Sequence, residues 1–135
     1  MSGFVIDASV LATWSLEDEA DARVDSVIES LTRLGACAPS LFFFEIRNVL
    51  IVNERRRRVT AAQSAEFVRE LSRMRIRLES PSQDLDLLAL ARERNLTIYD
   101  AAYLELAIRE GLPLATLDRA LERAATAEGV ALLGA

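Results

Sequence analysis

Apolar and polar residues follow two different periods along this chain. Short apolar runs of strand length occur at residues 3–7, 36–39, 76–80, 113–118 and 130–134. Between them lie longer segments whose apolar positions recur with helical spacing, at 8–16, 18–34, 40–58, 61–74, 85–95, 99–110 and 119–129. This alternation predicts an α/β fold with a central parallel sheet covered by helices on both faces.

Two helical segments carry recognisable start signals. Thr60 and Gln63 form a capping-box pattern at the start of the segment 61–74. Ser82 or Asp84 is expected to cap the next helical segment, because both residues accept hydrogen bonds from free backbone N–H groups. These signals support the helix assignments on either side of the strand predicted at 76–80.

The segment 40–58 is apolar nearly all round, which predicts a helix buried on two sides. Its "LFFF" run is expected to lie in the core, as is Trp14. A contact with a partner protein is the alternative for these aromatic residues.

Composition narrows the chemistry available to the chain. Its 135 residues fit a single domain spanning 1–135, with a net charge of −5. The chain has no histidine and no lysine, which excludes Ser-His-Asp catalysis, histidine metal sites and Schiff-base chemistry. A single cysteine, no evident signal peptide and no apolar run of bilayer length predict a cytoplasmic protein with no membrane contact. The groups that remain for catalysis are carboxylates, hydroxyls, arginines and a bound metal.

Two acids follow predicted strands. Asp7 ends the first strand signal and Asp118 ends a later one. In open parallel sheets, ligands bind beyond the carboxyl ends of the strands, so both acids are expected at that edge. Each also precedes a helix, and an N-cap is the alternative for either acid taken alone.

Two further acids interrupt apolar helical segments. Glu45 shares a helix face with Leu41 and Val49, and Asp100 follows Tyr99 in a segment rich in alanine. A buried ion pair is the alternative in both cases. Glu105 is different, because Arg109 stands at the i+4 position and can pair with it.

The four acids, Asp7, Glu45, Asp100 and Asp118, could therefore converge at one edge of the sheet. Several carboxylates cannot stay ionised side by side without a counter-charge. A hard divalent cation supplies that charge, and ligands that are all oxygen suit Mg²⁺ or Mn²⁺. Such an ion activates water and stabilises a phosphoryl transition state, which makes metal-dependent phosphodiester hydrolysis the simplest chemistry left.

Four motifs carry a family resemblance. In this order and spacing, "FVIDASVL", "SLFFFEIRNVL", "LTIYDAAYLELAI" and "LATLDRAL" resemble the PIN domain, and more narrowly the VapC-type toxin ribonucleases of bacterial toxin–antitoxin pairs. The resemblance runs from Phe4 to about Leu133. It implies a five-stranded parallel sheet flanked by helices, an RNA substrate, a homodimer, and inhibition by a cognate VapB-type antitoxin.

The resemblance also implies roles for individual residues. Asp7 and Asp100 would be the most direct metal ligands, and Glu45 and Asp118 would act directly or through water. Ser9 and Thr116 match small hydroxyl positions that support such a site, with turn or cap chemistry as the alternative. The resemblance thus implies that Asp7, Glu45, Asp100 and Asp118 are the catalytic and metal-binding residues, and that Ser9 and Thr116 support them.

A run of four arginines, Arg55, Arg56, Arg57 and Arg58, has two interpretations. It can be a solvated helix end, favoured by the helix dipole. It can also bind phosphates of RNA, or an acidic segment of an antitoxin. Other functions stay open at this point: a PIN nuclease with a housekeeping role, or a PIN-like binding module without catalysis. A receiver domain or dehalogenase-like phosphatase is disfavoured, because both normally need a lysine.

Overall fold

Four parallel strands form the centre of the fold, in the order β3-β2-β1-β4. The computed structural model describes residues 3–16, 21–82 and 86–134. The strands are β1 (Phe4–Ile6), β2 (Ala36–Pro39), β3 (Ile76–Glu79) and β4 (Leu114–Ala115). β1 and β4 are buried throughout, as expected for strands of a parallel sheet covered on both faces.

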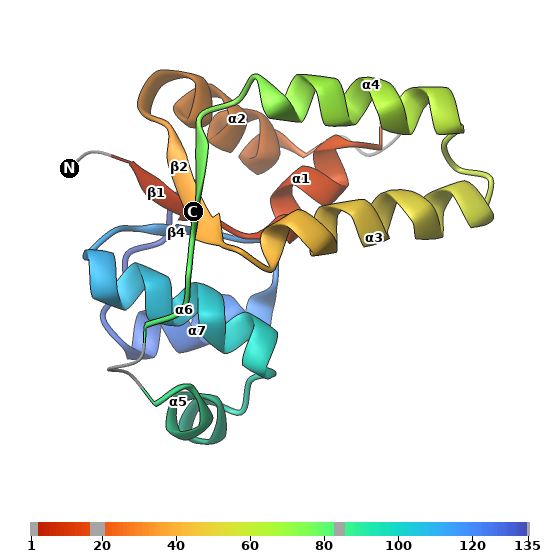
Figure 1. The fold of residues 1–135 in the computed structure, drawn as a ribbon. Helices are drawn as coiled ribbons and strands as arrows, with labels where there is room; N and C mark the ends of the chain where they lie inside the picture. Colours follow the sequence, from red (N-terminus) through yellow and green to blue (C-terminus); the bar gives the residue numbers. More distant parts are fainter. Residues whose placement is uncertain (1–2, 17–20, 83–85, 135) are drawn as a thin grey trace.

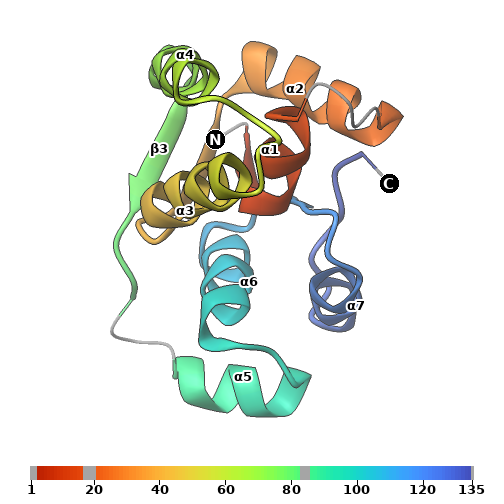
Figure 2. The same ribbon diagram turned by 90° about the vertical axis from the view of Figure 1, so that its right-hand side faces the viewer.

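Helices cover both faces of this sheet (Figure 1). They are α1 (Ala8–Trp14), α2 (Ala22–Leu34), α3 (Phe42–Arg55), α4 (Ala61–Ser72), α5 (Leu87–Arg94), α6 (Ile98–Glu110) and α7 (Arg119–Ala127). Helices α1 to α4 lie on one side, and α5 to α7 lie on the other (Figure 2). The first two crossovers move the chain from β1 to β2 to β3, and the third returns it past β1 to β4. Because such crossovers are right-handed, this reversal places the later helices on the opposite face.

The predicted α/β fold is confirmed, but the expected fifth strand is not present in the described part of the chain. The segment 130–134 forms a single parallel bridge, in which Leu132 pairs with Leu114 of β4. β4 is itself only two residues long, so it offers too little edge for a longer ladder. Gly129 and Gly134, both with positive φ, flank the bridge and keep it short.

The expectation that α3 is buried on two sides is wrong. Its buried residues recur at intervals of about one turn and form one face, with Phe42, Ile46 and Leu50 in the core. Phe43 and Phe44 point away from that face and are 41% and 72% exposed. The "LFFF" run therefore supplies one core residue and two exposed aromatic residues.

Helix starts are partly as predicted. The capping box at α4 is confirmed: Thr60 Oγ1 accepts from Gln63 N at 3.1 Å, and Gln63 Oε1 accepts from Thr60 N at 2.8 Å. Helix α5 is capped by Asp86 rather than Ser82, and Asp84 lies outside the described residues. Helix α2 begins after Asp21, whose side chain accepts from the backbone N–H of Arg23. The residues predicted to start that helix at 18–20 also lie outside the described part.

The core is continuous between the sheet and both helix layers. Helix α6 contributes an unbroken buried run, from Ala101 to Ala107, because it packs against β1, β2 and β4 on one side and α5 and α7 on others. Trp14 is partly buried at the rim of this core, where its ring packs against Phe67 of α4. None of the helices in the described residues is long and apolar enough to cross a bilayer.

Candidate active site

The ends of β1 and β4 bring two of the predicted acids to the same edge of the sheet. Asp7 follows β1 directly, and Asp118 follows β4 by three residues. The chain leaves β1 toward β2 on one side and returns to β4 on the other, so these two strands flank the switch point of the sheet. Open α/β sheets bind their ligands in the crevice at such a point.

A network of hydroxyl groups fixes Asp7. Its Oδ2 accepts from Thr116 Oγ1 at 2.6 Å and from Ser9 Oγ at 2.8 Å. In turn, Ser9 Oγ accepts from the backbone N–H of Leu117 at 2.9 Å, and Thr116 Oγ1 accepts from that of Asp118 at 3.0 Å. Asp7 makes no side-chain cap bond to α1. The structure thus places Ser9 and Thr116 against Asp7, where they orient the carboxylate and tie the end of β1 to the end of β4.

Asp118 differs from Asp7 in that it does cap its helix. Its Oδ1 accepts from the backbone N–H of Leu121 in the first turn of α7, at 3.0 Å. The alternative interpretation of this acid is therefore correct as a local description. A cap bond occupies one carboxylate oxygen, so it does not prevent the other oxygen from acting in a site.

Helix α3 supplies Glu45 from its first turn. Glu45 is half-buried, and its Oε1 accepts from the hydroxyl of Tyr103 at 2.6 Å. Burial raises the pKa of Glu45, and the charge of Asp7 raises it further, whereas the Tyr103 hydrogen bond lowers it. A side chain from α3 and one from α6 are thereby joined across the edge of the sheet.

Helix α6 supplies Asp100, also from its first turn. Thr97 caps this helix by accepting from the Asp100 N–H at 3.1 Å. Burial, followed by the charges of Asp118, Asp7 and Glu45, raises the pKa of Asp100 from 3.8 to about 6. All three other acids therefore lie near enough to repel it. The structure brings the four predicted acids, from four different elements, into one electrostatic cluster.

No cation in the described part of the chain balances this cluster. Among residues 3–16, 21–82 and 86–134, none of the four carboxylates forms an ion pair. Burial is the main cause that raises the pKa of Asp7, and the nearby Asp118 adds to it. Within the same ranges, no three carboxylates stand close enough to form a ready shell around one ion.

Glu105 shows what a compensated acid looks like on the same helix. It is 3% exposed, and its carboxylate accepts from Arg109 Nε at 2.9 Å. The i+4 pair predicted from the sequence is present. Asp100, five residues earlier, has no such partner in the described chain, so a structural ion pair does not explain it.

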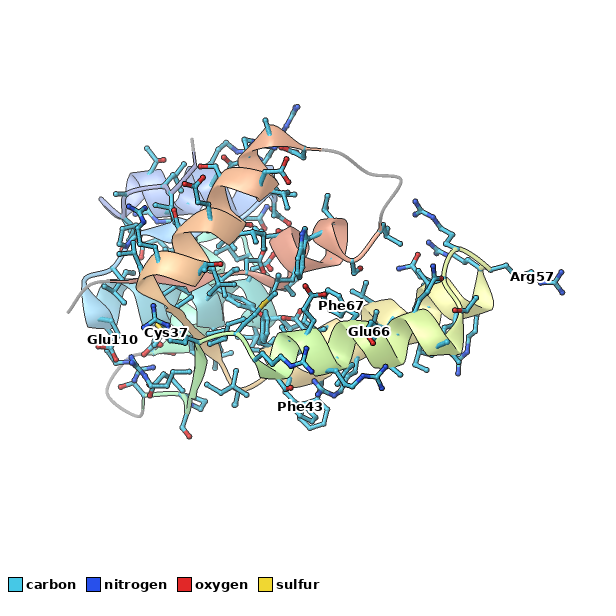
Figure 3. The ribbon with its side chains drawn as sticks, turned by 90° about the horizontal axis from the view of Figure 1, so that it is seen from above. Cys37, Phe43, Arg57, Glu66, Phe67 and Glu110 are labelled. Atoms are coloured by element: carbon cyan, nitrogen blue, oxygen red, sulfur yellow. The ribbon has the colours of Figure 1, made fainter. Side chains whose placement is uncertain are left out.

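The arginine run lies at a distance from the acids. Ten residue steps separate Glu45 from Arg55 along α3, which is about 15 Å at ~1.5 Å per residue. Arg57 projects from the tip of the α3–α4 pair, and Figure 3 shows it at the far end from Cys37 and Glu110. Arg58 lines a cleft of about 500 Å³ that also contains Trp14.

Reasoning from the sequence missed Tyr103. It is fully buried, and it holds Glu45 from a position 58 residues away. One signal was available: Tyr103 stands at i+3 from Asp100, and residues at that spacing share a helix face. The contact with Glu45 itself could not be derived from local spacing.

Comparisons with known proteins fit this geometry. The family model described as PIN domain matches residues 4–127. The chain is 30% identical over 120 residues to "Ribonuclease VapC3" of Pyrobaculum aerophilum, a match that covers 87% of this chain and 90% of that protein. It is 35% identical over 119 residues to "Exonuclease VapC9" of the same organism, with 87% and 82% covered.

A solved structure agrees with both matches. The crystal structure of PAE2754 from Pyrobaculum aerophilum has a TM-score of 0.70 to this chain at 31% identity, covering 91% of this chain and 86% of that one. The resemblance carried by the four motifs is thereby confirmed. The chain belongs to the PIN-domain family, and within it to the VapC proteins.

Proposed function

We propose that this protein is a metal-dependent endoribonuclease that acts in the cytoplasm as the toxin of a toxin–antitoxin pair. One observation carries the proposal. Asp7, Glu45, Asp100 and Asp118 lie in one cluster at the switch point of the sheet, and no cation of the described chain balances their charge. The relatives named as a ribonuclease and an exonuclease support nuclease chemistry.

The residues present fit a hard divalent ion. Every candidate ligand is a carboxylate oxygen, and the cluster needs positive charge. Mg²⁺ usually keeps several waters and binds through one or two carboxylates together with phosphate oxygens of the substrate. The described residues contain no tight shell of three carboxylates, which is compatible with this mode of Mg²⁺ binding. In this proposal Asp7 and Asp100 hold Mg²⁺ or Mn²⁺, and Glu45 and Asp118 act directly or through water.

The chain's own residues prepare this site for hydrolysis. Ser9 and Thr116 fix the orientation of Asp7, so little reorganisation is needed when charge develops at the phosphate. The chemistry that a divalent ion supplies at such a site is activation of water and stabilisation of negative charge on phosphate oxygens.

Protein partners are part of the proposal. We infer a cognate VapB-type antitoxin and a homodimer, as the family resemblance implies. The exposed aromatic pair on α3 supports a protein contact: the rings of Phe43 and Phe44 meet edge to face, and Arg47 lies 3.5 Å above the Phe43 ring. Side chains that are preorganised in this way on a surface are suited to burial against a partner.

Metal-dependent cleavage of RNA is the first test. Purified protein is incubated with a linear RNA and with the same RNA circularised, in Mg²⁺, in Mn²⁺ and in excess chelator. We expect cleavage of both RNAs with either metal and none in chelator, because four carboxylates without a counter-charge cannot bind a phosphate. Cleavage of the circle identifies an endonuclease, and cleavage of the linear RNA alone identifies an exonuclease.

The Asp100→Asn variant, purified in the same way, reveals any contaminating nuclease, since that activity would persist in it. Complete cleavage by the parent in excess chelator, absent from the variant preparation, would contradict the metal-dependent mechanism.

The stability of Asp100→Asn separates a metal ligand from a structural acid. The raised pKa means that Asp100 stabilises the fold when protonated, below about pH 3.8, and that this contribution is lost as the pH rises through about 6. In chelator the variant should therefore be more stable than the parent at pH 7.5, with a smaller advantage at pH 4.5. Urea unfolding at both pH values measures this, with the exposed Asp25→Asn on α2 as the control.

Added metal should reverse the comparison. At pH 7.5, the parent should gain about 2.7 kcal/mol of stability at a metal concentration a hundredfold above the dissociation constant. Asp100→Asn should lose most of that gain. If the variant is strongly destabilised in chelator and keeps the full gain, Asp100 holds the fold rather than the ion.

The salt dependence of RNA binding tests whether the arginine run binds phosphates. The variant with Arg55, Arg56 and Arg57 all changed to Gln should bind RNA more weakly, with the slope of log affinity against log salt reduced by about 2 for three lost contacts to single-stranded RNA. Binding is measured in Ca²⁺ or chelator to prevent cleavage. Arg58 is left in place because it has contacts in the cleft near Trp14.

The control variant carries the same change of charge elsewhere, with three exposed arginines replaced by Gln: Arg33, Arg69 and Arg73. It should keep the parent slope. If the slope of log affinity against log salt is the same for the parent and both variants, the arginine run is a solvated helix end.

A further inference from the structure

Tyr103 is buried in the core and yet bonded to an acid of the candidate active site. Its side chain is fully buried on α6, where the ring packs among apolar residues of the sheet and helices. Its hydroxyl reaches the edge of the sheet and donates to Glu45 Oε1 at 2.6 Å. A rigid core ring therefore ends in a polar group at the site.

This hydrogen bond is the only one that the described residues provide to the Glu45 carboxylate. A glutamate side chain has three rotatable bonds, and Glu45 stands near Asp7, whose charge repels it. Without a partner, the carboxylate would turn outward toward solvent. The phenol holds one oxygen in place and leaves the second oxygen available.

Tyr103 cannot replace Glu45 in the chemistry. A phenol has an ordinary pKa of about 10, so it remains a proton donor near neutral pH and does not compete as an anionic ligand. Its contribution is geometric, in the way that partners of metal-binding carboxylates orient their ligands. Ser9 and Thr116 do the same for Asp7.

We propose that Tyr103 is a positioning residue, which holds Glu45 so that its free oxygen serves the divalent ion of the site. This inference rests on the function proposed above and assigns a task to a residue outside the acidic quartet. Two of the four acids would thus be oriented by separate hydrogen bonds. Hydroxyl groups orient Asp7, which follows β1, and a phenol orients Glu45, which lies in the first turn of α3.

Binding of Mn²⁺ to the full chain, without RNA, tests the proposal. The metal-free protein is titrated with Mn²⁺, and free ion is followed by electron paramagnetic resonance. Tyr103→Phe removes only the hydroxyl and should weaken Mn²⁺ binding by about 10–100-fold, the usual effect of losing such a partner. The matched control is Tyr99→Phe, the same change on the same helix at a side chain that is 63% exposed, and it should bind like the parent.

A double-mutant cycle distinguishes positioning from a general effect on the fold. In the background of Glu45→Gln, adding Tyr103→Phe should cause no further loss of Mn²⁺ affinity, because the phenol acts only through the Glu45 carboxylate. An equal loss in both backgrounds overturns the proposal, and so does parent-like binding by Tyr103→Phe alone.

A second variant breaks the same bond without touching the core. Glu45→Asp shortens the side chain by one methylene and draws the carboxylate away from the phenol, so it should lose Mn²⁺ affinity as Tyr103→Phe does. If Tyr103→Phe does not fold, Glu45→Asp is used in its place. Parent-like Mn²⁺ affinity of Glu45→Asp overturns the proposal. A parent that binds no Mn²⁺ overturns the proposed function, whereas parent binding with no effect of these variants overturns only this inference.

Discussion

Repulsion between like charges is the constraint on which this structure's candidate site depends. Four carboxylates lie around the switch point of a parallel sheet, and the charges of Asp118, Asp7 and Glu45 raise the cost of ionising Asp100. The fold tolerates the cluster because hydrogen bonds rather than a cation hold three of the four acids: hydroxyls at Asp7, a phenol at Glu45 and a backbone N–H at Asp118. These bonds fix the direction of the carboxylates but do not neutralise their charge, and this uncompensated charge supports the proposal that the site binds a divalent ion.

Two acids on helix α6 differ in whether a positive charge lies beside them. Glu105 is more deeply buried than Asp100, yet it pairs with Arg109 one turn later and belongs to the structural framework. Asp100 lies in the first turn, beside three other acids and with no arginine partner in the described chain. The two acids therefore differ in the charge that surrounds them and not only in how deeply they are buried.

Much of this arrangement could be predicted from the sequence because it depends on local pattern. Period and turn signals placed β1 and β4, and the acids that follow these strands had to lie at one edge of a parallel sheet. The pair between Glu105 and Arg109 followed from i+4 spacing. Local pattern failed where packing between distant segments decides the outcome. Such packing determines which side of α3 is buried and whether segment 130–134 pairs with enough of β4 to form a strand. It also determines which group contacts Glu45. Tyr103 lies 58 residues away from Glu45, and no rule of spacing joins the two.

We propose that the cluster binds a divalent ion between Asp7 and Asp100. Crystals grown in Mn²⁺, with anomalous diffraction recorded at the manganese edge, locate that ion directly. We expect an anomalous peak within coordination distance of carboxylate oxygens of both Asp7 and Asp100, at about 2.0–2.2 Å as for comparable small divalent ions. Well-ordered crystals with manganese bound only elsewhere on the protein, and none at this edge of the sheet, would contradict it.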